Sequence, residues 1–167
     1  VCYSGRCFMS RSMGPRSGNR GDCSQACRLP YELLDGRMRS QGRARHWLSV
    51  RDLNLSDRLE EMIDAGVGSF KIEGRLKDMA YVRNVVGWYR SRLDEIFFRR
   101  PDLKRASQGS VALDFEPDPA KSFSRGSTHY FLDGPAAGVA SLDTPKSLGE
   151  AVGTVVSAGR EWFGMSG

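Results

Sequence analysis

Apolar residues recur at helical spacing in two stretches near the middle of the chain. From Asp78 to the Arg99-Arg100-Pro101 break they follow one another at three- and four-residue steps, which predicts a long helix with Asp78 as its N-cap. Its apolar positions are Val82, Val85, Val86, Tyr89, Leu93, Ile96 and Phe97. A shorter stretch of the same period predicts a helix that is capped by Ser56 and stopped by Gly66.

Each predicted helix follows a short apolar segment that favours a strand. These segments are residues 47–50 and residues 67–72, and apolar and polar residues alternate in the second. Strand, helix, strand and helix with short connections are typical of a parallel α/β sheet or barrel. The sequence therefore predicts an α/β fold in which residues 47–100 are the last βα units of a TIM-barrel-like domain.

The segments on either side lack this regularity. Residues 1–46 have no sustained period and are rich in Gly, Ser and Arg, which predicts a long functional loop region of the barrel. Residues 101–147 are interrupted by proline and glycine, which predicts a linker with irregular structure. Residues 148–167 are expected to begin a small, truncated β domain.

The two ends of the chain indicate a fragment of a larger protein. Val1 opens a cysteine-bearing stretch without an initiator Met, and Gly167 follows the aromatic pair Trp162-Phe163. No apolar run is long enough to span a membrane, and no signal-peptide pattern is visible. We therefore expect a cytoplasmic protein with no membrane partner.

The positive charge of the chain is concentrated near its start. The net formal charge is +5, and residues 1–46 contain nine arginines against three acidic residues. Guanidinium groups bind phosphate in bidentate fashion, so this excess favours a polyanionic partner such as RNA. A solvated basic loop would give the same pattern, and charge alone leaves both interpretations open.

All four cysteines lie within the first 27 residues. They are Cys2, Cys7, Cys23 and Cys27, with the spacing C-x4-C-x15-C-x3-C. Two disulfides, a structural zinc site and an iron–sulfur cluster are the three kinds of site that such clustering allows. Without a visible signal peptide disulfides are disfavoured, and a metal site of some kind is the preferred interpretation.

Four motifs make the chain resemble a known family. They are Gly5-Arg6-Cys7-Phe8-Met9-Ser10, residues 19–31 around Cys23 and Cys27, residues 69–75 with Lys77-Asp78-Met79, and Arg125-Gly126-Ser127-Thr128. Along nearly its whole length the chain resembles the collagenase-like peptidase family of unassigned catalytic type. The last three motifs look like the branch of that family that hydroxylates a cytidine of 23S ribosomal RNA.

The resemblance implies a [4Fe–4S] cluster on cysteine ligands. In the family signature the first cysteine precedes the glycine of G-x-C by five residues, which places it one position before Val1. Cys7, Cys23 and Cys27 then supply three ligands, the fourth lies upstream, and Cys2 is a bystander. We therefore expect the cluster site to be incomplete in this chain.

The resemblance also divides the expected function between two classes. The RNA-modifying branch implies oxygen-independent 5-hydroxylation of a 23S rRNA cytidine, with prephenate as the hydroxyl source. The family name implies a peptidase, which needs an activated nucleophile or a metal-bound water together with a base. Neither His46 nor His129 lies in a recognised protease motif, so RNA hydroxylation is preferred. A noncatalytic RNA- or partner-binding module is the third alternative.

Charged residues next to the predicted barrel strands are candidates for the chemistry. Glu73 follows the predicted strand at residues 67–72, and in barrels the reacting groups lie at the C-terminal ends of strands. Glu73 is accordingly the candidate for proton transfer, and a structural salt bridge with Arg75 is the alternative. The candidates for binding the carboxylates of a small anionic co-substrate, or RNA phosphates, are Arg20, Arg28, Lys71 and Arg75.

Structural roles are expected for the other conspicuous side chains. Helical spacing favours packing and partial surface cover, rather than base stacking, for the aromatic residues Trp88, Tyr89, Phe97 and Phe98. His46 is expected at the surface, and His129 in a structural loop.

Overall fold

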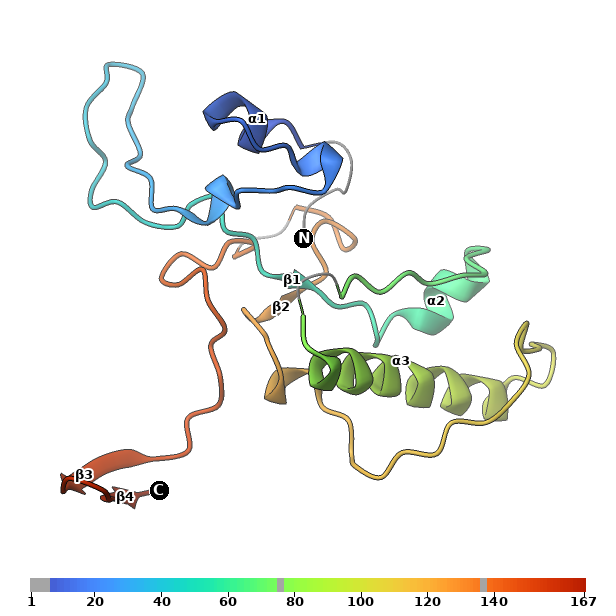
Figure 1. The fold of residues 1–167 in the computed structure, drawn as a ribbon. Helices are drawn as coiled ribbons and strands as arrows, with labels where there is room; N and C mark the ends of the chain where they lie inside the picture. The colour runs from blue at the N-terminus through green and yellow to red at the C-terminus, as the bar shows by residue number, and fades with distance from the viewer. Residues whose placement is uncertain (1–6, 75–76, 136–137) are drawn as a thin grey trace.

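The computed structural model describes residues 7–74, 77–135 and 138–167 (Figure 1). Its helices are α1 (Met9–Met13), α2 (Leu59–Asp64) and the long α3 (Met79–Arg99), with 3-10 turns η1 (Gly18–Arg20), η2 (Ala26–Arg28) and η3 (Pro119–Lys121). Its strands are β1 (Asp52–Leu53), β2 (Ser127–Thr128), β3 (Thr154–Ala158) and β4 (Phe163–Ser166). The chain is a mixed α/β structure with few regular elements. None of the described helices is long and apolar enough to cross a membrane.

The long helix α3 forms where the apolar period predicts it. The Asp78 carboxylate accepts a hydrogen bond from the Tyr81 backbone N–H at 2.7 Å, which confirms Asp78 as the N-cap. The helix ends at Arg99, two residues before Pro101. Local sequence therefore determines both ends of this element.

One face of α3 is buried against the rest of the chain. Val85 and Ile96 on this face are 8% and 5% exposed. Gly87 lies between them, and a Cβ at that position would be 3.2 Å from Leu113 Cδ1. The absence of a side chain at Gly87 thus lets the segment that follows the helix pack directly on it.

The predicted helix before Gly66 is confirmed as α2, but it starts later than expected. Its first residue is Leu59, and the preceding residue makes no side-chain capping bond. Ser56, the expected cap, is buried and its Oγ accepts the Trp88 indole N–H at 2.8 Å. The Ser56 hydroxyl therefore binds a side chain of α3 instead of capping its own helix as the sequence predicted.

Gly66 ends α2 as predicted, through a standard helix-terminating turn. Its φ of +94° is in the left-handed region, which glycine adopts without strain. The Gly66 N–H donates to Ile63 O at 2.8 Å, and the Val67 N–H donates to Met62 O at 2.9 Å. These two bonds are those of a Schellman motif.

The strand predicted at residues 47–50 is displaced toward the C-terminus. Regular pairing occurs in β1, which lies parallel to β2 with Asp52 opposite Ser127. Earlier in this segment, Val50 forms only an isolated antiparallel bridge with Ala140. The segment therefore has a neighbour on each side, both from the last third of the chain, as Figure 1 shows around β1 and β2.

The strand predicted at residues 67–72 is wrong for the structure described. Phe70 and Ile72 are half-buried and Lys71 is exposed, so the alternation of the sequence is present in the burial pattern. These residues nevertheless belong to no ladder. A strand needs a neighbour for its backbone groups, and no described segment pairs with this one. The described residues accordingly form no barrel.

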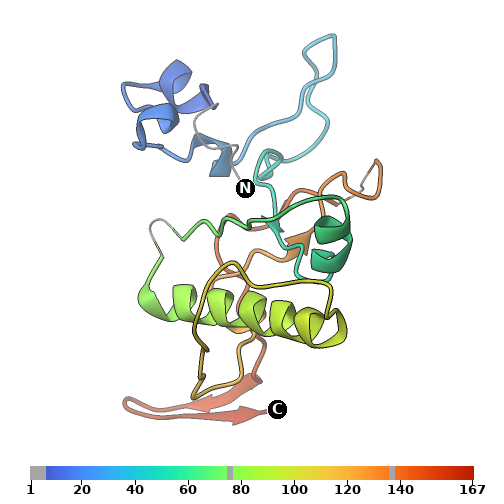
Figure 2. The same cartoon turned by 90° about the vertical axis from the view of Figure 1, so that its right-hand side faces the viewer.

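β3 and β4 form an antiparallel hairpin in which Thr154 pairs with Ser166. The hairpin stands apart from the helices in both views (Figures 1 and 2). A Cβ on Gly159 would meet the exposed Trp162 indole, which would have to shift to admit a side chain there. The hairpin lies where the sequence places the start of a β domain, but the division of the chain into four segments stays a prediction.

Candidate functional site

The three cysteines of the described chain lie in one small layer. Cys7 lies two residues before α1, Cys23 lies between η1 and η2, and Cys27 lies in η2. Helix α1 contacts both 3-10 turns, which brings the three half-buried residues into the same region, at the top of Figure 1. We call residues 7–31 the cysteine layer.

Ser10 is the internal anchor of the cysteine layer. It is 2% exposed, and its Oγ accepts hydrogen bonds from the Ser24 N–H at 3.0 Å and the Ser24 hydroxyl at 3.1 Å. The same Oγ lies 3.4 Å from Cys23 Sγ, which also accepts the Gln25 N–H at 3.2 Å. The Cys23 sulfur is thereby held in a polar setting with an N–H donor.

The cysteine layer contains three thiols of the kind that bind iron–sulfur clusters, but among the described residues they do not converge on one metal position. Cys7 and Cys27 carry free thiols, and hydrogen bonds to cysteine sulfur are typical of cluster ligands. Within the described ranges, however, no three His, Cys, Asp or Glu side chains converge so that they could hold a metal ion. Cys2 lies outside the described residues, and the expected fourth ligand lies outside the sequence.

Arg28 connects the cysteine layer to the segment before β1. Its Nη1 donates to Ser49 Oγ at 2.9 Å and to Val50 O at 2.7 Å, and its own carbonyl lies 2.9 Å from His46 Nδ1. Burial lowers the pKa of the Arg28 guanidinium, and the nearby Arg125 lowers it further, whereas Cys27 acts in the opposite direction. Arg28 is thus a half-buried cation next to a cysteine.

Arg125 is held beneath this layer by Asp52 of β1. Its Nη2 forms an ion pair with the Asp52 carboxylate, which also accepts the Arg125 backbone N–H at 3.0 Å. Only 13% of the Arg125 side chain is exposed. Its Nε is buried and has no hydrogen-bond partner among the residues described. We call Arg28, Lys77 and Arg125, together with Asp52, the basic cluster.

Lys77 completes the basic cluster from the start of α3. Its Nζ lies over the Phe123 ring, 2.8 Å from the centroid, and the guanidinium carbon of Arg125 lies 5.0 Å from the same centroid. Burial lowers the pKa of Lys77, and the positive charges of Arg125 and Arg28 add to this effect. Lys77 and Arg125 thus share one face of the basic cluster, on the Phe123 ring, and Asp52 forms an ion pair with Arg125.

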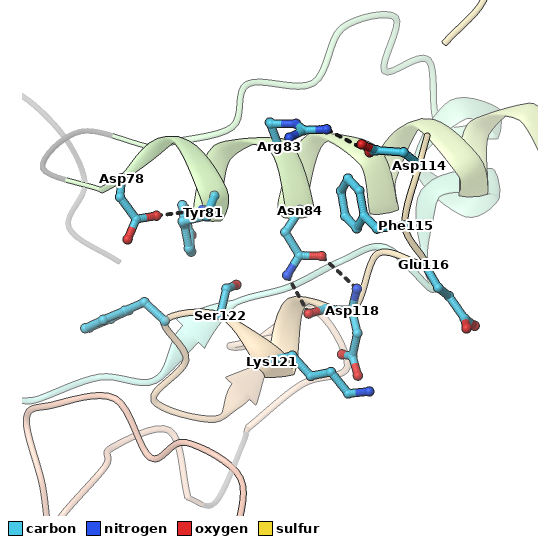
Figure 3. A pocket seen from close by; sticks show the side chains of 12 residues that line it. Asp78, Tyr81, Arg83, Asn84, Asp114, Phe115, Glu116, Asp118, Lys121 and Ser122 are labelled. Carbon is cyan, nitrogen blue, oxygen red and sulfur yellow. Dashed lines mark hydrogen bonds and ion pairs between the residues drawn. The ribbon is translucent and has the colours of Figure 1, made fainter. Parts of the chain in front are cut away.

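A pocket of about 580 Å³ lies next to the basic cluster, between α3 and residues 114–123 (Figure 3). Its two sides are joined by Asn84, whose Nδ2 donates to Asp118 O at 2.6 Å and whose Oδ1 accepts the Asp118 N–H at 2.7 Å. Tyr81 and Phe123 line it, and burial raises the pKa of Tyr81. Phe123 is therefore a wall that the pocket and the basic cluster share.

Comparison of the sequence with models of known protein families identifies the family of the chain. The model of peptidase family U32 matches residues 1–140, which include the cysteine layer, the basic cluster and the pocket. The chain belongs to peptidase family U32. No solved structure matches it.

Several curated proteins are similar to this U32 chain. The "23S rRNA 5-hydroxycytidine C2501 synthase" of Escherichia coli K12 is 48% identical over 161 residues, which are 96% of this chain and 25% of that protein. The "tRNA hydroxylation protein P1" of Bacillus subtilis is 41% identical over 56% of this chain and 24% of its own length. A "Collagenase" of Porphyromonas gingivalis is 35% identical over 56% of this chain and 26% of its own length. The chain thus spans about a quarter of these relatives.

The substrate-binding candidates named from the sequence are not gathered in one place. Arg28 lies in the basic cluster, whereas Arg20 is exposed at the end of η1. Lys71 forms an ion pair of 3.0 Å with Glu73, and the two side chains are 81% and 52% exposed. Arg75 lies outside the described residues. For these residues, and for the three cysteines, the proposed roles stay predictions.

Sequence reasoning missed Lys77 and Arg125 of the U32 chain. Both lie in motifs that carry the family resemblance, Lys77-Asp78-Met79 and Arg125-Gly126-Ser127-Thr128. Their motif membership was the signal that could have selected them. Spacing could not, because 48 positions separate them in the chain and only the β1–β2 pairing brings Arg125 to Asp52.

The histidines and the packed aromatic residues make structural contacts. His129 lies between two carboxylates, with Nε2 at 3.1 Å from Asp57 and Nδ1 at 3.2 Å from Asp133. His46, expected at the surface, is half-buried. The Tyr89 hydroxyl donates to Asn54 Oδ1 at 3.0 Å, whereas Phe98 is 91% exposed. Tyr89 is therefore packed, whereas Phe98 lies at the surface, and both positions agree with the expected mixture of packing and surface cover.

Proposed function

We propose that this U32 protein carries out, as part of a longer chain, the oxygen-independent 5-hydroxylation of a cytidine in 23S ribosomal RNA in the cytoplasm. The observation that carries the proposal is the similarity to the E. coli synthase, at 48% identity over 96% of the chain. That similarity extends beyond residues 1–140, which the family model matches, whereas the tRNA hydroxylation protein and the collagenase are similar over 56%.

The cysteine layer is the proposed cluster site. Cys7, Cys23 and Cys27 would provide three thiolate ligands to a [4Fe–4S] cluster, and a cysteine upstream of Val1 would provide the fourth. The N–H donor on the Cys23 sulfur supports this assignment, because hydrogen bonds to sulfur tune cluster potentials. When bound, the cluster would supply electron transfer to the reaction, with prephenate as the source of the hydroxyl group.

Charged residues are proposed to handle the substrates. Glu73 is exposed and forms an ion pair with Lys71, and its carboxylate is proposed to transfer a proton at a bound nucleotide. The residues proposed to bind an anionic substrate, either RNA phosphates or the carboxylates of a small co-substrate, are Arg20, Arg28, Lys71 and Arg75. We place all of them in the last part of a TIM-barrel-like domain, whose other strands would come from the longer chain.

The cluster and its function are tested with the intact protein, produced without oxygen. Iron, sulfide and visible absorption are measured for the wild type, for Cys27→Ser and for the matched control Cys2→Ser. Hydroxycytidine in 23S rRNA is measured in cells that lack the gene and carry each variant. We expect Cys27→Ser to lose the cluster and the modification, and Cys2→Ser to retain both.

Three outcomes would contradict the proposal. Equal loss of iron in both cysteine variants would remove the assignment of Cys2 as a bystander. Peptide cleavage by an iron-free protein, abolished by Cys27→Ser, would favour the peptidase alternative. Binding of ribosomal RNA without any change in hydroxycytidine when the gene is deleted would indicate a noncatalytic binding module.

A further inference from the structure

We propose that residues 31–45 form a rigid finger that binds folded RNA, with Arg37 and Arg43 on phosphates and the Met38 side chain as a wedge against the bases. The finger is inferred from the structure of this segment, to which the cysteine and barrel assignments give no role. That its RNA is 23S ribosomal RNA rests on the function proposed above.

The finger is an antiparallel pair of extended segments. Tyr31 and Arg45 exchange two backbone hydrogen bonds at its base, of 2.8 and 3.0 Å, and Leu34 forms a bridge with Ser40 further out. Residues 36–44 are all exposed, and the finger projects away from the rest of the described chain in both views (Figures 1 and 2). A two-stranded ribbon is narrow enough to enter a wide groove of a nucleic acid.

The base of the finger is attached to the cysteine layer. The Tyr31 hydroxyl donates to Ala26 O at 2.8 Å and lies 3.5 Å from Met13 Sδ of α1. On the other side of the base, Arg45 forms an ion pair of 2.7 Å with Asp143. RNA held by the finger would therefore lie beside the cysteine layer.

The tip of the finger is a turn that Asp35 holds in one conformation. Its Oδ1 accepts the Arg37 N–H at 2.8 Å and the Arg39 N–H at 3.0 Å, and its Oδ2 accepts the Arg39 Nε–H at 2.9 Å. The Met38 N–H donates to Asp35 O at 2.9 Å. A tip that is already ordered loses little conformational freedom when it binds a partner.

Met38 stands at the tip in a conformation that suits glycine. Its φ is +58°, in the left-handed region that bulky side chains rarely adopt and that glycine usually occupies in such hairpin turns. The side chain is 77% exposed, so it contributes little to packing. Backbone strain of this kind is concentrated at functional sites. Proteins that deform nucleic acids insert apolar side chains, methionine included, between base steps.

Charge favours RNA as the partner of this tip. Arg39 and Arg45 are paired with carboxylates, whereas in the described part of the chain Arg37 and Arg43 form no ion pair and their side chains are exposed. Guanidinium groups bind phosphates, and folded RNA offers phosphates next to bases that can be unstacked. Charge alone is also compatible with a solvated loop, so the strained, exposed Met38 is the observation that favours a partner.

The wedge also fits the chemistry of the proposed reaction. An enzyme that modifies a base takes it out of the stack, at a cost in stacking and pairing energy. An apolar side chain that fills the vacated space offsets part of that cost. We therefore assign Met38 as a positioning residue for the target cytidine.

The phosphate contacts are tested by the salt dependence with which the intact protein binds a purified 23S rRNA fragment. The variant combines Arg37→Gln with Arg43→Gln. Its matched control combines Lys104→Gln with Arg160→Gln, which also removes two exposed positive charges. The slope of log K against log salt concentration should fall by about 1 for each arginine of the finger and stay as in the wild type for the control. An unchanged slope in the finger variant would overturn the proposal.

The wedge is tested with Met38→Gly, which suits the left-handed backbone and should leave the finger folded. Exchange of the Asp35 amide, which donates to Arg39 O at 2.9 Å, monitors the fold of the finger. A 2-aminopurine next to the target cytidine reports unstacking through its fluorescence. We expect the fluorescence to rise on binding of the wild type and of Met38→Leu, and the rise to be lost in Met38→Gly. Phe98→Ala, at a position that is 91% exposed, should behave as the wild type.

Three further results would decide the proposal. An equal fluorescence rise with Met38→Gly and with the wild type would overturn the wedge. Normal binding of purified rRNA by the arginine variant, together with lost binding of ribosomal particles, would indicate a protein partner and overturn the RNA contact. A finger-dependent salt slope in a protein whose gene deletion leaves hydroxycytidine unchanged would support the RNA contact while rejecting the proposed function.

Discussion

The cysteine layer and helix α3 are stabilised in opposite ways. In α3, a capping carboxylate and a long apolar period act along 21 consecutive residues, and Val85 and Ile96 are buried. In the cysteine layer the elements are three to five residues long, and the buried side chains are Ser10 and Ala26. Hydrogen bonds between residues far apart in the chain take the place of an apolar core in this layer.

This difference explains why a ligand would affect the two regions unequally. Single turns are not stable on their own, because nucleating a helix costs more than one turn returns. Metal binding to cysteine thiolates contributes directly to folding free energy. We therefore expect the cysteine layer to gain stability from the proposed cluster, and α3 to depend on packing.

The largest loss of stability is expected for Leu59→Ala, which removes a buried side chain from the packing between α2 and α3. Leu59 is 1% exposed, and its helix α2 contacts α3. The substitution should lower the free energy of unfolding by about 2–5 kcal/mol through lost burial and a cavity. Hydrogen exchange of the α3 amides in the intact protein measures it. Leu33→Ala, at a position that is 48% exposed, is the control, and equal exchange in both variants would contradict the packing argument.

The next largest loss of stability is expected for Ser10→Ala, which removes the buried hydroxyl that accepts hydrogen bonds from Ser24 in the cysteine layer. Removing Oγ leaves the Ser24 N–H without its acceptor, at a cost of about 1–3 kcal/mol. Faster exchange of the Ser24 amide and faster loss of iron to a chelator are the readouts. Ser12→Ala removes an exposed hydroxyl that donates to Met9 O, and it should change neither. Should both variants behave alike, Ser10 would not be the anchor.

A smaller effect is expected for Asp78→Ala, which removes the cap of α3. The lost bond to the Tyr81 N–H should destabilise the first turn by about 0.5–2 kcal/mol. Asp78→Asn is the control, because asparagine is also a good N-cap. Exchange of the amides in the first turn distinguishes them. If the alanine and asparagine variants gave the same rates, the carboxylate would not be acting as a cap.

The smallest effect is expected from acid titration of Asp94 in α3. The hydrogen bond from Arg90 lowers the pKa of Asp94, with a further contribution from Arg105. The folded-state pKa is therefore below the unfolded value of about 3.9, so the stabilisation is complete above that value and is lost as pH falls through the folded pKa.

The acid effect should amount to a few tenths of a kcal/mol, as for other helical ion pairs at this spacing. The pH dependence of exchange near the C-terminus of α3 would reveal it. Asp94→Asn should abolish the acid-dependent part, whereas Glu95→Gln, at an exposed pair with Arg92, should retain it. A wild-type pH profile in the Asp94→Asn protein would contradict this assignment.

Predictions from sequence succeeded where short-range chemistry decides the structure. As expected, α3 begins after Asp78 and α2 ends before Gly66. Both ends were predictable because a cap and a left-handed turn depend on residues within one helical turn. Ser56 and residues 67–72 did not behave as expected. A hydroxyl binds the best donor within reach, which here is Trp88 from another helix, and a strand needs a neighbour that the local pattern cannot supply.

The candidate site also has parts that were predictable from local sequence and parts that depend on long-range contacts. The cysteine positions and the position of Arg28 could be named from motifs, whereas the meeting of Arg28 with Lys77 and Arg125 could not. It depends on the parallel pairing of β1 with β2, which joins segments 75 residues apart. Charge excess in the first 46 residues drew attention to exposed arginines, while two of the three enclosed cations lie outside that segment.

By itself, the sequence determined the family, the long helix with its two ends, and the cysteines that could bind a cluster, because periodicity, caps and motifs are local properties of the chain. Only the tertiary structure decided which cations lie together and that Arg125 is the one that pairs with Asp52. Desolvation and mutual charge depend on the distance between atoms in space, and the β1–β2 pairing, not the order of residues, sets that distance for Asp52 and Arg125.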